Sequence, residues 1–300
     1  MRADSGMRRS AALFRPFPCS MRSGRGGLIE LWWLLAAFTS IAVGSAQAQL
    51  QQRPMSTCAP QAVGTGMVSR VLDGRSFMLD DGREIRLTSI EVPFLGASDE
   101  TDARARAGRA ARATLEIILA GQAVELRQSR SAADRYGRMI ADAYILEHGV
   151  QRSAAMEMLA RGFARVSGQI VDGGCAAEFL ANEQAARRAK LGLWAEAYYS
   201  LVPADSLSDL LPQRGHFTVV EGKVLSVRES GAIIYVNFGR RWSEALTVTI
   251  AKRNERQLVA AGLNPRKLEN IRVRVRGWVE ERNGPRIEVS RPEQIELAER

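Results

Sequence analysis

The stretch from Val68 to Phe94 constrains the fold of this chain more than any other. It contains segments of apolar or alternating residues at 68–72, 76–79 and 84–89, separated by two Asp-Gly dipeptides. Asp-Gly is a turn dipeptide at the spacing of a β-hairpin, so the stretch predicts a three-stranded meander. Pro93 ends the meander because proline cannot donate a hydrogen bond to a strand ladder. A different kind of element must follow.

Two parts of the chain share one order of predicted elements. After the meander, residue patterns predict a helix at 103–119, strands at 123–128 and 139–146, and further helices at 153–160 and 176–191. The second part predicts strands at 217–227, 232–238 and 246–250, a helix at 253–261, and a hairpin of 271–280 with 286–289. Three strands, a helix and two strands is the order of a five-stranded OB barrel. The expected fold class is therefore mainly β with α, an OB-fold barrel with packed helices followed by a second, smaller OB-like barrel.

The first 48 residues have the features of a secretory signal peptide. Arginines in residues 1–27 precede an apolar run at 31–43, and Ala46-Gln47-Ala48 supplies a small-x-small cleavage pattern. The apolar run is shorter than the ~20 residues that span a bilayer, so an uncleaved membrane anchor is the alternative reading. Met21 is an alternative start to Met1. The chain is therefore predicted to be exported, to the periplasm or the medium, and to contact a membrane only through an uncleaved leader.

Positive charge is concentrated in the C-terminal part. The net charge of the whole chain is +9, residues 213–300 carry +6 of it, and residues 49–212 carry −1. This balance alone does not identify a nucleic-acid binder. Its distribution points to Arg272, Arg274 and Arg276, which alternate and so share one strand face. That face is predicted to follow a phosphate backbone, or else to be an exposed face balanced by neighbouring glutamates.

Aromatic residues accompany these basic residues. Trp242 and Trp278, with Tyr235 and Phe238, lie in the predicted strands and loops of the C-terminal part. They are candidates for stacking platforms on which unpaired bases would lie. Packing within the protein is the alternative for each of them.

Cysteine and histidine content limits the metal chemistry. Cys19 lies in the predicted leader, which leaves Cys58 and Cys175. In an exported chain these two can form a disulfide that ties an N-terminal arm to the helix at 176–191, or they remain free thiols. The sequence has no CxxC pair, and its two histidines are His148 and His216. This content argues against a zinc site.

Residues 64–194 resemble the staphylococcal nuclease (thermonuclease) family. Five segments carry the resemblance, in the family's order: VLDGRSF, IRLTSIEVP, DRYGRMIADAY, LARGFARV and EQAARRAKLGLW. The resemblance implies an OB barrel with helices packed on it. It also implies hydrolysis of phosphodiesters by water, with a Ca²⁺ ion, a carboxylate base and two arginines. The C-terminal part resembles the OB-like domain that accompanies such nuclease domains in some exported bacterial proteins.

Several of the family's site residues correspond to residues of this chain. The resemblance places the two phosphate-binding arginines at Arg86 and Arg138; the alternative is that they are structural arginines that pair with Glu91 or Asp73. Tyr136 is a candidate binding residue beside Arg138, with packing as its alternative. One calcium carboxylate corresponds to Glu91. The other corresponds to Arg75, and the general base to Phe94. Because Arg75 brings a positive charge to the cation position and Phe94 cannot accept a proton, we expect the family's hydrolysis to be largely absent.

We further hypothesise that Arg75 pairs with Glu91 and fills the place of the cation. No cofactor is then expected. The alternative is a working nuclease with a rearranged site, which would use calcium and take its base from Asp99, Glu100 or Asp102. The predicted organisation is a signal peptide at 1–48, an arm at 49–63, the nuclease-like domain at 64–194, a linker at 195–214 and the OB-like domain at 215–300.

The predicted function is that of a binding module derived from a nuclease. Its partner is expected to be nucleic acid, another polyanion or a protein of the cell envelope. A purely structural role in the envelope is a further alternative.

Overall fold

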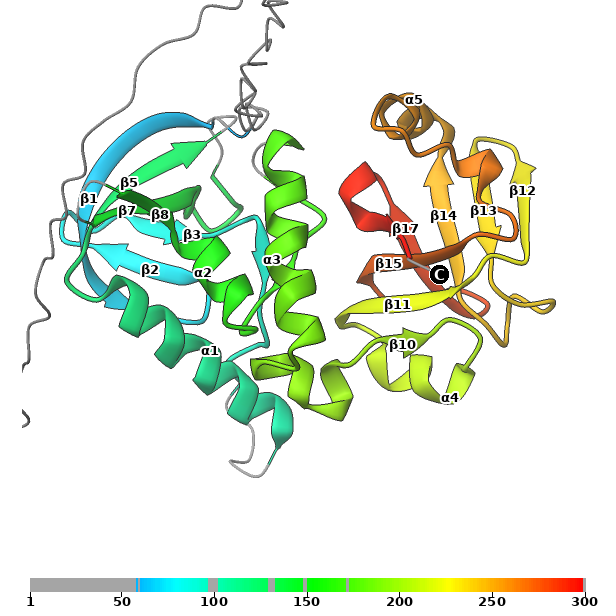
Figure 1. Cartoon of the computed structure of the whole chain (residues 1–300), viewed down its shortest axis with the longest axis horizontal. Coiled ribbons are helices and arrows are strands. Elements are labelled where there is room, and N and C mark those ends of the chain that lie inside the picture. Colours follow the sequence, from blue (N-terminus) through cyan, green and yellow to red (C-terminus); the bar gives the residue numbers. More distant parts are fainter. Residues whose placement is uncertain are drawn as a thin grey trace, which may run out of the picture. The chain divides into compact units, whose positions relative to one another are not determined.

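The computed structural model describes residues 58, 60–96, 102–128, 133–147, 150–170 and 173–298. Arg53–Arg300 form one compact unit, and Figure 1 shows its helices and strands. The predicted signal peptide and residues 49–57 of the predicted arm lie outside the described residues. None of the described helices is long and apolar enough to cross a membrane.

A seven-stranded sheet is the framework of the N-terminal part. Its strand order is β6-β3-β2-β1-β5-β7-β8, and β3 pairs with β6 in parallel while the other neighbours are antiparallel. Only Ala141 separates β6 from β7, so one extended segment pairs with β3 and then with β5. The strands are β1 (Gln61–Val71), β2 (Ser76–Leu79), β3 (Glu84–Arg86), β5 (Ala123–Gln128), β6 (Met139–Ile140), β7 (Asp142–Glu147) and β8 (Val150–Ser153).

Three helices pack their apolar residues against this sheet. They are α1 (Ala103–Leu119), α2 (Ala154–Ala160) and α3 (Ala176–Arg188). Side-chain caps start the first two, because Asp102 accepts from the N–H of Arg104 at 2.9 Å and Ser153 accepts from the N–H of Met156 at 3.3 Å. Buried leucine, isoleucine, alanine and phenylalanine side chains of the sheet and helices form one hydrophobic cluster.

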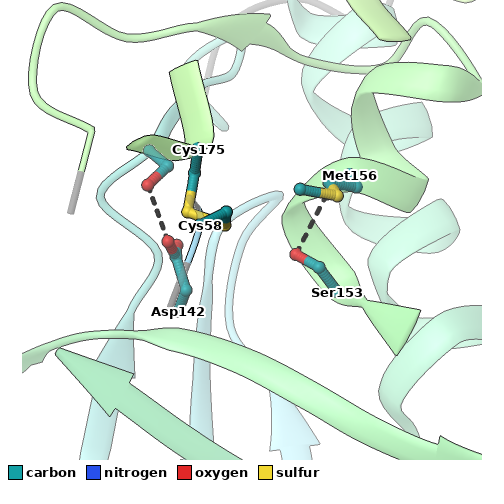
Figure 2. Close-up of a disulfide and its surroundings, with 6 residues drawn as sticks. Cys58, Asp142, Ser153, Met156 and Cys175 are labelled. Atoms are coloured by element: carbon teal, nitrogen blue, oxygen red, sulfur yellow. Dashed lines mark hydrogen bonds between the residues drawn. A yellow bond between two sulfur atoms is a disulfide. The ribbon is translucent and has the colours of Figure 1, made fainter. Parts of the chain in front are cut away.

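A disulfide fixes the N-terminal end of this part. Cys58 and Cys175 are bonded, with a Cα–Cα distance of 4.3 Å, and 117 positions separate them in sequence (Figure 2). Cys175 is buried at the start of α3, and Cys58 packs against the same hydrophobic cluster. The bond therefore ties the chain just before β1 to the helix that follows β9 (Arg165–Val166), whose partner strand is β4 (Ile90–Glu91).

Two sheets form the C-terminal part, and the chain passes from one to the other between β11 and β12 and between β15 and β16. The first, in the order β10-β11-β15-β18, contains β10 (Val202–Pro203), β11 (Phe217–Lys223), β15 (Arg272–Trp278) and β18 (Ile295–Leu297). The second, in the order β12-β13-β14-β17-β16, contains β12 (Ser226–Ser230), β13 (Ile233–Asn237), β14 (Thr247–Ala251), β17 (Pro285–Val289) and β16 (Glu280–Glu281). The helices of this part are α4 (Leu207–Leu210) and α5 (Lys252–Ala260).

The strand pairings of the C-terminal part form a circuit. Strand β11 pairs with β15, and the chain continues from β15 through Val279 into β16. Strand β16 pairs with β17, β17 with β14, β14 with β13, and β13 with β12. Residues 224–225 connect β12 back to β11. The pairing of β14 with β17 is parallel, and α5 lies between β14 and β15 in the chain. The N-terminal part has the same sequence of pairings, with α1 between β3 and β5. The expected fold class, an OB-like unit with packed helices followed by a second β-rich unit, is therefore confirmed, although the sheets of the described residues do not close into the expected barrels.

Several elements differ from the sequence-based expectation in extent. The strand expected at 84–89 is shorter and ends at Arg86, whereas those expected at 139–146, 217–227 and 271–280 are each divided in two, because the chain turns from one neighbour to the next. The segment predicted as a linker, 195–214, contains β10 and α4 and places Val202 and Leu210 in the second hydrophobic cluster. The hairpin at Asn283-Gly284 forms as expected, with Asn283 at φ 59° and Gly284 at φ 138°.

A buried ionic network links α3 to the C-terminal sheet. Glu183, on α3, is 0% exposed and accepts from Arg276 of β15 at 2.7 and 3.1 Å. It also accepts from Arg187 at 2.9 Å and from the N–H of Val166 at 2.5 Å. Arg276 in turn contacts Glu296 of β18. Burial removes the hydration of these charged side chains, and the attraction between opposite charges offsets that cost only because each charge has an oppositely charged partner.

Removing the Glu183 carboxylate will destabilise the protein strongly. In Glu183→Gln the guanidinium of Arg276 stays buried with one carboxylate fewer, and such a loss costs about 3–5 kcal/mol. Chemical denaturation monitored by circular dichroism measures the change in the free energy of unfolding. Glu244→Gln is the matched control, because it removes one partner of the exposed Arg241–Glu244 pair at 2.8 Å and will change stability by less than about 1 kcal/mol. Equal effects of the two substitutions would contradict this account of the network.

Asp142 will make stability depend on pH. It lies in the surroundings of the disulfide (Figure 2), is 2% exposed and accepts from Ser89 at 2.7 Å. Burial raises the pKa of Asp142 to about 6. Because the folded-state pKa lies above the unfolded value, its contribution to stability is full below pH about 4 and is lost as pH rises through about 6.

Replacing Asp142 with asparagine removes this dependence. Between pH about 4 and 7, the free energy of unfolding of the unsubstituted protein will fall relative to that of Asp142→Asn by about 3 kcal/mol. Urea denaturation at several pH values, without reductant, measures the difference. Parallel pH profiles of the two proteins would show that Asp142 titrates alike in the folded and unfolded states.

Candidate anion site on the first sheet

The turn between β1 and β2 carries the first site residue. Asp73 accepts from the N–H of Arg75 at 2.8 Å and so holds the turn in shape. Gly74 is buried, and a Cβ atom there would lie 2.9 Å from the Cβ of Ala111 in α1 and 3.2 Å from Cγ2 of Val92. Glycine therefore lets the turn pack against α1 and against the residue that follows β4. This packing directs Arg75 toward Glu91.

Arg75 and Glu91 form the internal ion pair that we hypothesised. Nη1 of Arg75 lies 2.6 Å from Oε2 of Glu91 and also donates to the carbonyl of Ile90 at 3.1 Å. The two side chains are 13% and 15% exposed. In the strand register Glu91 lies opposite the buried Arg165 of β9, and its charge acts on that guanidinium without a direct ion pair among the described residues. Its negative charge is thus balanced from within the protein.

Arg138 is held by the carboxylate of Asp134 in its own loop and lies near that of Glu84 on β3. Nε and Nη2 of Arg138 each lie 2.6 Å from Oδ2 of Asp134, and Nη1 lies 3.8 Å from Glu84. Oδ1 of Asp134 accepts from the N–H groups of Tyr136 and Arg138 at 2.9 and 3.1 Å. Burial alone would raise the pKa of Asp134, but hydrogen bonds from Arg138 and the backbone outweigh it and lower that pKa. The loop is thereby fixed with Arg138 facing β3.

Arg86 differs from both neighbours because it has no carboxylate partner. It lies on β3 and is half-buried, and among the described residues its side chain forms no hydrogen bond or ion pair. Burial lowers the pKa of Arg86, and the charges of Arg75 and Arg138 lower it further. An arginine remains protonated at neutral pH in such surroundings. The site therefore presents one uncommitted cation with two others close by.

Two aromatic residues lie at this site. Phe94 is 84% exposed, and its carbonyl lies so close to α1 that a Cβ on Gly108 would approach it to 2.7 Å. Tyr136 is 67% exposed, with the guanidinium groups of Arg135 and Arg138 at 4.9 and 5.1 Å from its ring centre. A phenyl ring can neither accept a proton nor bind a metal. Tyr136 offers an exposed ring beside the arginines.

The donor set does not fit a calcium ion. Ca²⁺ takes six to eight oxygen ligands, mainly carboxylates, and Glu91 is already neutralised by Arg75. Within the described ranges, no group of three or more His, Cys, Asp and Glu side chains is arranged to hold a metal ion. Among the alternative bases, Asp102 caps α1 and pairs with Arg104 at 3.1 Å, whereas Asp99 and Glu100 lie outside the described residues.

The three arginines of β15 do not form an exposed stripe. Arg276 is 1% exposed and belongs to the network around Glu183, so it is not available to a ligand. Arg274 and Arg272 both bind Glu221 of β11, at 2.6 and 2.8 Å. The strand alternation was sufficient to place them on one face, but it could not show that acidic residues of neighbouring elements cover that face.

Residues 84–196 match the family model described as staphylococcal nuclease homologue. The match overlaps the nuclease-like domain predicted at 64–194, and we keep that name for residues 64–194. The matched span contains Arg86, Glu91, Phe94 and Arg138, whereas Arg75 and the C-terminal part lie outside it. No curated protein matches the chain.

The structure adds a buried cation that the sequence did not identify. Arg165 is 5% exposed, and its Nε and Nη1 atoms have no hydrogen-bond partner in the part of the chain that the structure describes. Its guanidinium lies 5.2 Å from the ring centre of Tyr199 and 5.6 Å from that of Phe217. Nothing in the LARGFARV segment distinguishes this arginine from a surface residue. A signal did exist for Glu183, because it lies between Phe179 and Ala186 on the buried face of α3.

Calcium binding will require removal of the Arg75 charge. The unsubstituted protein will show no calcium-dependent rise in melting temperature, because the carboxylate of Glu91 is already paired with Arg75. Arg75→Asp frees Glu91 and adds a second carboxylate, so millimolar calcium will raise the melting temperature of this variant. Differential scanning fluorimetry with calcium and with chelator measures the shift. Arg70→Asp, an equal charge change at an exposed position of β1, is the control and will gain no calcium response. Equal stabilisation of the unsubstituted protein by calcium would contradict this assignment.

Proposed function

We propose that the nuclease-like domain binds phosphate groups of nucleic acid and has lost most of the hydrolysis that its family resemblance implies. Arg86 carries this proposal, since it is a half-buried guanidinium without a carboxylate partner, between Arg75 and Arg138. A phosphate oxygen supplies the acceptor that the protein does not provide. Of the two carboxylates whose charges act on Arg86, Glu91 is paired with Arg75, and Asp73 accepts the backbone N–H of Arg75.

Two groups that the family resemblance implies are absent, the general base at position 94 and a calcium-binding carboxylate at position 75, and their absence accounts for the proposed loss of hydrolysis. At Phe94 no base can remove a proton from an attacking water, and loss of general-base catalysis lowers rates by about 10²–10⁴. At Arg75 the protein supplies a fixed positive charge that partly replaces the cation in binding phosphate. This charge is already shared with Glu91, so it stabilises a transition state less than a free cation does.

Export is part of the same proposal. The predicted signal peptide and the Cys58–Cys175 disulfide both fit an oxidising compartment such as the periplasm. In that compartment a binding module would meet nucleic acid released from cells, or polyanions of the envelope. An envelope protein as partner and a purely structural role remain alternatives, and the experiment below distinguishes nucleic-acid binding from both.

Substitution of Arg86 will weaken the binding of a short nucleic acid. A 5′-phosphorylated thymidine dinucleotide titrated into the full chain by calorimetry will bind tenfold to a hundredfold more weakly to Arg86→Ala, because one charge-assisted hydrogen bond contributes about 1.5–3 kcal/mol. Arg188→Ala is the control, because it removes the same charge from the exposed end of α3. No binding of the dinucleotide to the unsubstituted protein would leave the structural role standing.

A cleavage assay tests the proposed loss of hydrolysis. Single-stranded DNA and RNA incubated with the full chain will stay intact both with calcium and with chelator. Calcium-dependent cleavage that disappears in Arg138→Ala would instead establish the working nuclease.

A further inference from the structure

A groove crosses the outer face of the second sheet in the C-terminal part. It has a volume of about 920 Å³. Its walls come from β12, β13, the start of β14, the loop 239–242 and the turn 282–286. Gly284 closes one end, because a Cβ there would lie 2.2 Å from the carbonyl of Trp242. The turn 282–286 and the loop 239–242 are therefore in direct backbone contact.

Strand register aligns polar residues along the floor of this groove. Ser226 is opposite Asn237, Asn237 is opposite Thr247, and Thr247 is opposite Arg286. The next row on the same face starts with Arg228 opposite Tyr235. Four strands at about 4.8 Å spacing give a polar strip of about 14 Å from β12 to β17. Arg286 lies at its β17 end, and Arg228 lies in the next row at its β12 end.

The groove carries positive charge that the protein does not neutralise. Among the described residues, Arg228 and Arg240 form no ion pair and no side-chain hydrogen bond. Arg286 has a buried Nε atom without a hydrogen-bond partner, and it shares Glu280 with Arg282 at 3.4 and 3.6 Å. The lining contains a single acid, Glu229, which is already bound to Lys252 at 3.0 Å and to Arg266.

Two aromatic side chains stand among these arginines. Trp242 is 56% exposed, and Tyr235 is half-buried on the floor of the groove. Their roles differ from those of the other two aromatic candidates. Phe238 is 6% exposed in the second hydrophobic cluster, and Trp278 packs edge-on against Phe217 at 6.2 Å on the other sheet.

We propose that this groove binds a single strand of nucleic acid. Phosphates would bind Arg228, Arg240 and Arg286, and unpaired bases would stack on Tyr235 and Trp242. Excess positive charge in a groove follows a phosphate backbone, and exposed aromatic faces select strands whose bases are free to stack. The site is separate from the one around Arg86 and does not depend on it.

Fluorescence anisotropy of the full chain with a labelled oligothymidylate of about 16 nucleotides, the upper end of known site sizes for one OB fold, tests the groove. Tyr235→Ala and Trp242→Ala will each weaken binding about tenfold, whereas Tyr235→Phe will retain it because the ring remains. Trp278→Ala is the matched control for an exposed tryptophan outside the groove. Thermal melting confirms that each variant is folded.

The salt dependence provides a second measurement. In Arg228→Ala/Arg240→Ala the slope of log affinity against log salt concentration will fall in magnitude by about 1.4, since each lost phosphate contact on a single strand contributes about 0.7. Arg253→Ala/Arg256→Ala removes two exposed charges from α5 and will change the slope less.

Three outcomes would overturn the groove assignment. They are equal binding of duplex and single strand, unchanged binding in both aromatic variants, and equal effects of the two arginine double variants. The experiments test the two proposed sites independently of each other. Loss of dinucleotide binding in Arg86→Ala alone supports only the site on the first sheet, and loss of oligothymidylate binding in the groove variants alone supports only the groove.

Discussion

The carboxylate of Glu183 holds the described parts of this chain together. It accepts hydrogen bonds from Arg276 of the C-terminal sheet, from Arg187 of its own helix and from the backbone of β9 at Val166. Strand β9 pairs with β4, and β4 carries Glu91. The position of the anion site is thus connected, through one short sheet, to a buried charge network. Because any other packing would leave a buried charge unpaired, the network favours a single arrangement of α3 against the C-terminal sheet.

The anion site shows how a metal-dependent arrangement can be replaced by internal charge. Arg75 supplies in the protein a positive charge that the family resemblance assigns to a bound cation, and Glu91 is retained as its partner at 2.6 Å. An ion pair of this kind is fixed in position and needs no free ion. It can help to bind a phosphate, but it provides no open coordination position for a water or a substrate oxygen. The proposed function thus separates binding from hydrolysis.

Arginine has three distinct states in this structure, and burial and partners distinguish them. Arg276 is buried and bound to carboxylates, so it stabilises the fold. Arg165 is buried without hydrogen-bond partners for two of its nitrogen atoms, against the rings of Tyr199 and Phe217. Arg86 and Arg228 have neither a carboxylate nor a hydrogen-bond partner among the described residues. The third state is the one that offers binding to an external anion.

The sequence by itself determined the order of most elements. The Asp-Gly and Asn-Gly turns, the helix at 103–119 and the strand at 123–128 follow from local conformational preferences, which depend on neighbouring residues alone. It also determined which residue types occupy the positions of the nuclease-like site. Only the tertiary structure decided which arginines are free, because a charge's partners come from distant segments. Arg276 and Arg228 look alike in sequence, but Glu183, 93 positions away, neutralises the first, and no described residue neutralises the second.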